Sequence, residues 1–128
     1  MIYVDTSVVL AQLLSEDRVP PTMLWARTLV ASRLLEYDLW NRLNARRLTA
    51  SHGAAARQLL QRVAMLELLP MVLARALEPF PVPVRSLDGL HLASIEYLRT
   101  ARQEVQLATY DVRMAEAARA MGIPLFEL

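Results

Sequence analysis

The chain has 128 residues, of which 55% are hydrophobic, and this length suits one domain, residues 1–128, with a core that needs no disulfides. Cysteine is absent, which excludes thiolate chemistry and favours a cytoplasmic protein, and no apolar run reaches the ~20 residues of a membrane span. The net charge of +1 does not by itself indicate nucleic-acid binding, but all 14 basic residues are arginine. The lack of lysine excludes P-loop nucleotide hydrolysis and any mechanism with a catalytic lysine.

The first ten residues predict a short strand followed at once by a helix. Residues 2–4 form an apolar, β-prone run, and residues 5–7 (Asp-Thr-Ser) are types that favour helix N-caps. We therefore expect the strand to end on the carboxylate of Asp5, at the edge of a sheet. An aspartate in this place is also an ordinary helix cap, so its role depends on the other residues that accompany it.

Short apolar runs and helical patterns alternate along the rest of the chain. Strands are expected at residues 2–4, 29–31, 66–71, 105–109 and 125–128. Helices are expected at residues 8–15, 22–27, 33–48, 71–77, 87–101 and 111–121. Ser51 is expected to cap another helix, with an apolar stripe of Ala55, Leu59, Leu60, Val63 and Leu66. Ser86 is expected to cap the helix at 87–101, and Gly122 to close the helix at 111–121.

This alternation predicts an α/β domain in three layers, α/β/α, with a central, mostly parallel sheet of four to five short strands. The proline-rich residues 78–85 are interpreted as a stiff loop within the domain, because too few residues follow it to form a second one.

Carboxylates recur where strands end and helices begin. Asp5 and Asp111 follow predicted strands, Asp88 lies in the first turn of a helix, and Glu36 and Asp38 compete for a fourth place. Carboxylates gathered at one sheet edge repel one another unless a cation lies between them, and Mg²⁺ or Mn²⁺ prefers oxygen ligands. Such a site suits metal-assisted hydrolysis of phosphodiesters, whereas each aspartate taken singly is explained by helix capping.

Four segments together resemble the PIN-domain ribonucleases, and most closely the VapC toxins of bacterial toxin–antitoxin pairs. They are residues 4–7 (Val-Asp-Thr-Ser), 32–43, 86–93 (with Asp88, His91 and Ala93) and 108–111 (Ala-Thr-Tyr-Asp). The resemblance implies a PIN-like fold and a Mg²⁺- or Mn²⁺-dependent endoribonuclease that cleaves RNA. It also implies a cognate antitoxin and a homodimer.

The resemblance assigns roles residue by residue. Asp5 matches the first family acid, Asp88 the third and Asp111 the fourth, and these three are the implied metal ligands. Thr6 and Thr109 match hydroxyls that support these carboxylates in the family.

The second family acid is a departure, because the family usually has a glutamate where this chain has Asp38, one methylene shorter. Glu36 lies two residues earlier and points about 200° away on an ideal helix, so both cannot face one site. The motif register favours Asp38, acting on the metal through water. Glu36 stays the competing residue, or is a partner of Arg47.

Other residues also have structural interpretations. Arg42 and Arg46 would contact RNA phosphates or form part of a solvated helix face. His91 is interpreted as structural because hard cations prefer oxygen, and Trp25 and Trp40 as core.

Two other functional classes remain open. One is a PIN-like domain with a degenerate site that binds RNA or protein. The other is an aspartyl-phosphate phosphatase or receiver-type domain, which the missing Asp-x-Asp pattern and the missing lysine disfavour.

Overall fold

The computed structural model describes residues 1–128, in which strands and helices alternate. The strands are β1 (Ile2–Val4), β2 (Leu29–Ser32), β3 (Val63–Leu66) and β4 (Gln106–Ala108). The α-helices are α1 (Thr6–Leu14), α2 (Leu34–Ala45), α3 (Thr49–Leu60), α4 (Pro70–Ala76), α5 (Ser86–Thr100) and α6 (Val112–Ala120), and a 3-10 helix, η1, spans Thr22–Ala26. No helix is both long enough and apolar enough to cross a membrane.

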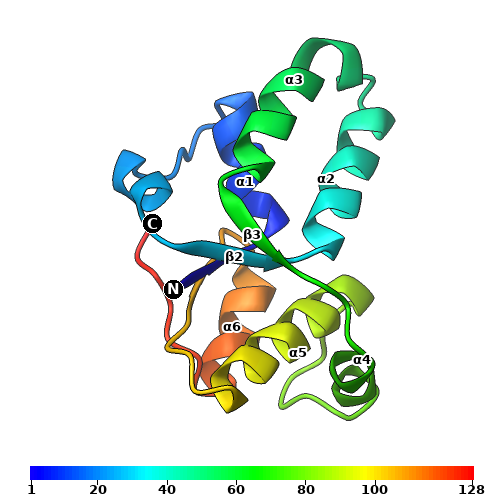
Figure 1. Ribbon diagram of the computed structural model, residues 1–128, viewed down its shortest axis with the longest axis vertical. Helices are drawn as coiled ribbons and strands as arrows, with labels where there is room; N and C mark the ends of the chain where they lie inside the picture. The colour runs from blue at the N-terminus through cyan, green and yellow to red at the C-terminus, as the bar shows by residue number, and fades with distance from the viewer.

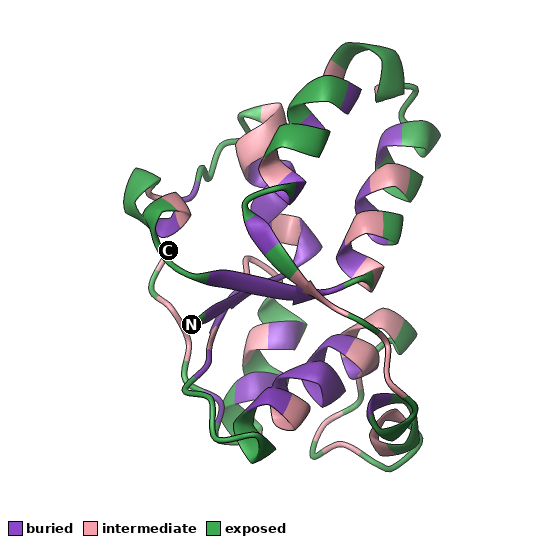
Figure 2. Ribbon diagram, in the orientation of Figure 1, coloured by how far each residue is buried: buried purple, intermediate pink, exposed green.

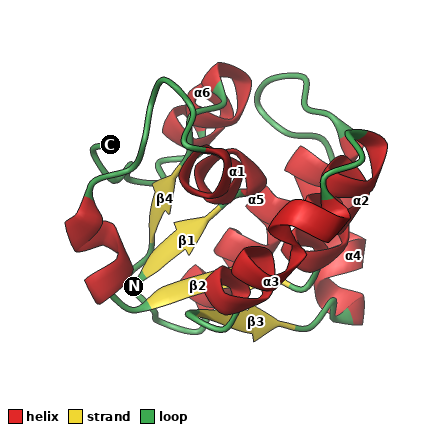
Figure 3. Cartoon of the chain, turned by 90° about the horizontal axis from the view of Figure 1, so that it is seen from above, coloured by secondary structure: helices red, strands yellow, loops and turns green.

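The four strands form one sheet in the order β3-β2-β1-β4, and every neighbouring pair is parallel (Figure 3). In the register, Ile2 lies opposite Leu29 on one side and Gln106 on the other. The carboxyl ends of β1 and β4 therefore lie side by side. Asp5 follows the first of them and Thr109 to Asp111 follow the second.

The sheet is covered on both faces, which confirms the three-layer α/β/α prediction. Figure 1 shows α1, α2 and α3 above the sheet and α4, α5 and α6 below it. Every residue of β1 and β2 is buried, as Figure 2 shows, and this double burial explains why their sequences are continuous apolar runs rather than alternating ones.

The helices contribute regular apolar faces to one core of 26 buried residues. Leu35, Leu39 and Leu43 of α2 are fully buried, as their helical spacing predicts. Trp25 and Trp40 pack against this core while remaining partly exposed. The core therefore fixes which side of α2 faces the sheet, and this decides where its acidic residues point.

The third strand is Val63–Leu66, so the prediction of a strand at 66–71 was wrong. Val63 and Leu66 were also wrongly placed on a helical stripe, because α3 ends at Leu60. The cause is tertiary, since all four residues of β3 pair with β2, from Leu29 opposite Val63 to Ser32 opposite Leu66. Only Gln61 and Arg62 separate α3 from β3, and the apolar residues on either side of them fit a helical period as well as a strand.

Two predicted serine caps and the last strand were also wrong. Ser51 lies inside the first turn of α3 and donates to the Leu48 carbonyl, and Ser86 is the first residue of α5 with no side-chain cap before it. The predicted strand at 125–128 is reduced to one parallel bridge between Leu107 and Leu125. In contrast, Asp111 caps α6, and Gly122 follows its end with a φ of 71°.

Candidate active site

A polar cavity of about 380 Å³ opens at the carboxyl ends of β1 and β4, and Leu87 is its single hydrophobic lining residue. We call it the acidic pocket; its polar lining residues are Asp5, Asp38, Asp88, Asp111, Thr6, Ser7, Ser86, His91, Arg42 and Arg85. The structure thus brings together the four predicted aspartates. Ligands of open α/β sheets bind at this edge, where the strands end.

Asp5 is the most closely held of the four carboxylates and is 6% exposed. Its Oδ1 accepts from the backbone N–H of Ser7 at 3.1 Å and from the Ser7 hydroxyl at 2.5 Å. Its Oδ2 accepts from the Thr109 hydroxyl at 2.5 Å. Asp5 is therefore both the N-cap of α1 and a carboxylate clamped between two strand ends.

The same two hydroxyls also hold the segment after β4. The Ser7 oxygen accepts from the backbone N–H of Tyr110, and the Thr109 oxygen accepts from the N–H of Asp111, both at 2.9 Å. Each hydroxyl thus donates its one proton to Asp5 and accepts a hydrogen bond from a backbone N–H of the segment after β4. Ser7 was not predicted as a site residue, although its place two residues after an N-cap is a signal for this contact.

Burial raises the pKa of the Asp5 carboxyl to about 6, against the opposing effect of the hydrogen bonds from Ser7 and Thr109. Desolvation penalises the charged form, and the negative charge of Asp111 acts in the same direction. The clamped carboxylate is thus costly to ionise without a nearby positive charge.

Asp88 and Asp111 lie on either side of one arginine that sequence reasoning did not single out. Arg85 Nη2 lies 3.1 Å from Asp111 Oδ2, and Arg85 Nε lies 3.5 Å from Asp88 Oδ2. Burial, and then the negative charge of Asp111, raise the pKa of Asp88. The Arg85 side chain is 64% exposed, so solvent screens the positive charge that it brings to the pair.

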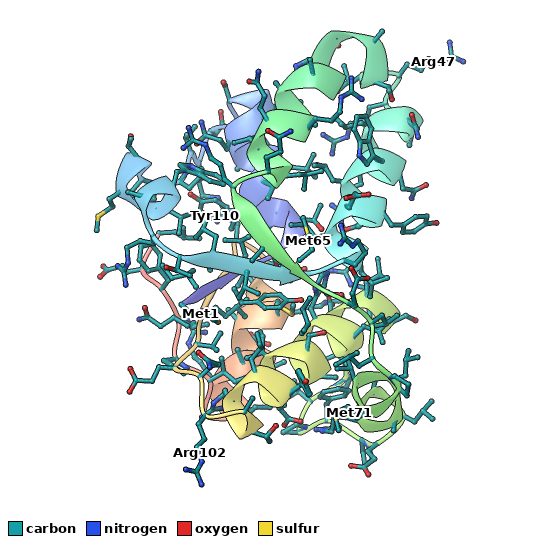
Figure 4. The ribbon with its side chains drawn as sticks, in the orientation of Figure 1. Met1, Arg47, Met65, Met71, Arg102 and Tyr110 are labelled. Carbon is teal, nitrogen blue, oxygen red and sulfur yellow. The ribbon has the colours of Figure 1, made fainter.

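Asp38 faces the acidic pocket and Glu36 does not. Asp38 is 7% exposed and its Oδ1 lies 3.4 Å from Arg42 Nε, one turn along α2. Glu36 lines a different cavity and pairs with Arg33 at 3.5 Å. The expected pairing of Glu36 with Arg47 was wrong, because Arg47 has a left-handed backbone (φ 57°) and points into solvent beyond the end of α2 (Figure 4).

His91 is buried behind the carboxylates and bonded to the sheet. Its Nδ1 lies 2.5 Å from the Tyr3 hydroxyl, whose oxygen accepts from the backbone N–H of Ser32. Burial lowers the pKa of His91 to about 4, so the ring is neutral and Nδ1 can accept the Tyr3 proton. This arrangement fits the structural role expected for His91 and leaves its Nε2 protonated, on a ring that lines the acidic pocket.

The donor set of the acidic pocket fits a hard divalent cation. Its anionic groups are all carboxylates, and Oδ2 of Asp88 and Oγ1 of Thr6 are buried without a hydrogen-bond partner. No three acidic or histidine side chains lie at ligand spacing, and arginines pair with three of the four aspartates. Oxygen-rich groups with unsatisfied atoms are the pattern that Mg²⁺ and Mn²⁺ complete, with waters filling the other positions.

Arg42 lines the acidic pocket, and Arg46 lies one turn further along α2, in the wall of a neighbouring cavity. Arg42 and Arg46 are both exposed. The two arginines predicted as phosphate contacts thus lie beside the carboxylates, and Arg42 is paired with Asp38.

Comparisons with known proteins match nearly the whole chain. The family model described as "PIN domain" matches residues 2–120. The protein named "Ribonuclease VapC47", from Mycobacterium tuberculosis (strain CDC 1551 / Oshkosh), is 30% identical over 129 aligned positions, which cover 95% of this chain and 93% of the relative. The match to the family model includes all four strands and the four aspartates of the acidic pocket.

Proposed function

This chain belongs to the PIN domain family, and on that premise we propose that it is a metal-dependent endoribonuclease, the toxin of a type II toxin–antitoxin pair. The observation that supports this best is the convergence of Asp5, Asp38, Asp88 and Asp111 on one polar pocket, in which a buried Asp88 oxygen accepts no hydrogen bond. The name of the mycobacterial relative, a ribonuclease, supports RNA as the substrate.

We assign the metal-ligand role to Asp5, Asp88 and Asp111, and an outer role through water to the shorter Asp38. When bound, Mg²⁺ or Mn²⁺ supplies a Lewis acid that lowers the pKa of water and screens phosphate charge. Ser7 and Thr109 fix the two oxygens of Asp5, so that this carboxylate needs no reorientation during the reaction. Thr6 adds a hydroxyl without another partner.

The arginines supply the positive charge that RNA needs beside four carboxylates. Arg42 lies at the entrance, 3.4 Å from Asp38, and Arg46 one turn beyond it. We assign both to the phosphates that flank the scissile bond, where they hold the strand in place without reading its sequence.

The proposed partners are a cognate antitoxin protein and a second copy of this chain, and the proposed location is the cytoplasm. Membership of the PIN domain family and the VapC name of the relative support the two partners, and the absence of cysteine supports the location. Residues 1–128 are proposed to act as one domain around the single core described above. Co-purification with the product of an adjacent small gene, and light scattering, would test these assignments.

Cleavage of a labelled RNA in Mn²⁺, and its loss in EDTA, is the direct test. Asp5→Asn and Asp88→Asn should abolish cleavage while far-UV circular dichroism stays unchanged, and Glu116→Gln, at an exposed acid of α6, should cleave normally. Calorimetry with Mn²⁺ distinguishes this proposal from the alternative of a PIN-like domain with a degenerate site, since such a domain would bind no metal. Full activity of Asp5→Asn would refute the proposal.

A further inference from the structure

A second cavity, of about 510 Å³, lies beside the acidic pocket and is lined by residues of the opposite charge. We call it the arginine pocket; the residues that define it are Arg18, Arg42, Arg46, Arg85, Arg113 and Tyr110. The two cavities share Ser7, Arg42, Arg85 and Asp111 in their walls, so they form one continuous surface. Five arginines against three carboxylates make the arginine pocket positive where its neighbour is negative.

Tyr110 is the aromatic residue of the arginine pocket, and its position is fixed by the acidic pocket itself. It lies between Thr109, which donates to Asp5, and Asp111, and its own N–H is bound by Ser7 at 2.9 Å. The ring is therefore held one residue from a carboxylate of the site.

The Tyr110 ring is partly buried against the core, and one of its faces is covered by a side chain from an exposed residue. The guanidinium of Arg18, an exposed residue of the segment after α1, lies over the ring at 4.8 Å from its centroid. A planar cation on an aromatic face occupies the same kind of place that a nucleobase takes when it stacks. Because Arg18 is exposed, its side chain can move aside into solvent, and a base that displaces it would stack on this face.

We propose that the arginine pocket binds a nucleotide of single-stranded RNA adjoining the scissile phosphate, with its base stacked on Tyr110 and its phosphate held by Arg46 and Arg113. This inference rests on the proposed ribonuclease function, because it places the substrate strand across both pockets. A duplex base is already stacked on its neighbours, so a ring set in a pocket wall selects an unpaired one. Stacking accepts any base, with purines giving the larger contact area.

The test is fluorescence anisotropy of short labelled oligoadenosine and oligouridine in EDTA, where binding is measured and cleavage is absent. Tyr110→Leu should raise the Kd for oligoadenosine about tenfold, and less for oligouridine, while Tyr110→Trp should keep the affinity. Tyr37→Leu is the matched control, because Tyr37 is 63% exposed on α2 and lines neither pocket. It should bind both RNAs as the wild type does.

The charge contribution has its own matched pair in two adjacent arginines. Arg46→Gln should weaken binding of both RNAs about equally and lower the salt dependence by about one ion, whereas Arg47→Gln should change neither. Figure 4 shows why, since Arg47 extends away from the body of the molecule.

The outcomes separate this inference from the proposed function. Metal-dependent cleavage with wild-type RNA affinity in Tyr110→Leu and Arg46→Gln would overturn the arginine pocket and leave the ribonuclease standing. RNA binding that depends on Tyr110, in a protein that does not cleave RNA with Mn²⁺ present, would support the arginine pocket and overturn the ribonuclease function. Failure of the wild type to bind either RNA would overturn the inference, whether or not cleavage is seen. A pocket that binds a protein partner instead would give either no RNA binding or the same RNA affinity in the variants as in the wild type.

Discussion

The acidic pocket and the arginine pocket lie side by side but are built in opposite ways. In the first, Asp5 and Asp38 are almost fully buried, and Asp5 is held by three hydrogen bonds from groups on two chain segments. In the second, Arg18, Arg46 and Arg113 belong to exposed residues, and their charges are solvated. The acidic pocket is held in place by hydrogen bonds, and its buried carboxylates are costly to ionise. The arginine pocket consists of exposed side chains that can adjust their positions, and keeping them charged costs little free energy.

The difference corresponds to what each surface has to do. A metal site needs carboxylates within a fraction of an ångström of fixed positions, and only packing and hydrogen bonds provide that. A surface that follows a flexible RNA strand benefits from long side chains that adjust to each sequence. We therefore expect substitutions in the two pockets to differ in their effects on stability as well as on activity.

The largest expected effect is on stability, through Asp5. Its pKa is raised from 3.8 to about 6, so between these values the folded state holds a proton that the unfolded chain has released. The contribution of Asp5 to the free energy of unfolding in EDTA should fall as the pH rises through this window, by up to about 3 kcal/mol, roughly a hundredfold in the folding equilibrium. The buried His91, whose pKa is lowered to about 4, contributes in the opposite direction, so the Asp5 contribution is measured as the difference between the wild type and Asp5→Asn. Asp5→Asn should gain stability relative to the wild type between pH 4.5 and pH 7.5.

Urea unfolding at pH 4.5 and 7.5 measures this, with Arg46→Gln as the control. Because Arg46 is exposed and in the other pocket, its substitution should leave the stability at both pH values as in the wild type. A difference in stability between the wild type and Asp5→Asn that is the same at pH 4.5 and pH 7.5 would show that burial does not raise the pKa of Asp5.

The next effect is on cleavage and separates two acids of one helix. Asp38→Asn should lower kcat/KM by about 10- to 100-fold, the range for groups that act on a metal through an outer contact. Glu36→Gln should leave kcat/KM unchanged, because Glu36 faces another cavity and pairs with the exposed Arg33. The reverse pattern would transfer the second acid of the site from Asp38 to Glu36.

A smaller effect is expected from the clamp on Asp5. Ser7→Ala removes the 2.5 Å hydrogen bond to Asp5 and leaves the Tyr110 N–H without its partner, so kcat/KM should fall about tenfold. The Ser7 bond lowers the Asp5 pKa, so its loss should also shift Mn²⁺ binding to higher pH. Ser94→Ala, whose hydroxyl donates to Leu90 within α5, should show neither change, and an unshifted pH profile in Ser7→Ala would argue against the clamp.

What the sequence predicted well depends on neighbours along the chain. Asp5 and Asp111 each follow a short apolar run and precede a helix, so strand, carboxylate and cap could be inferred from a few adjacent residues. Asp38 was favoured over Glu36 by the register of the motif that resembles the PIN-domain ribonucleases, and Leu35 and Leu39 lie on the same buried side of its helix. The three-layer fold followed from the alternation of these local units.

What the sequence did not predict depends on contacts between distant segments. The start of β3 at Val63 is set by pairing with Leu29, and the contact of Arg85 with Asp111 joins residues 26 apart. Similarly, the Ser7 hydroxyl meets Tyr110 across 103 residues. No local pattern encodes these contacts, so Ser7 and Arg85 were recognised as site residues only when the strand ends were brought together.

Arg85 belongs to both pockets, and the smallest predicted effect measures how strongly they are coupled. Its guanidinium lies 3.1 Å from Asp111 and 3.5 Å from Asp88, where it partly neutralises two carboxylates that we assign to the metal. Arg85→Gln should therefore tighten Mn²⁺ binding by about two- to fivefold in calorimetry, the scale of exposed ion pairs, while RNA affinity in EDTA weakens. Opposite changes in metal and RNA affinity from one substitution would mean that the two pockets compete for a single cationic side chain. Unchanged Mn²⁺ affinity would mean that solvent already screens Arg85, and that the two pockets act independently.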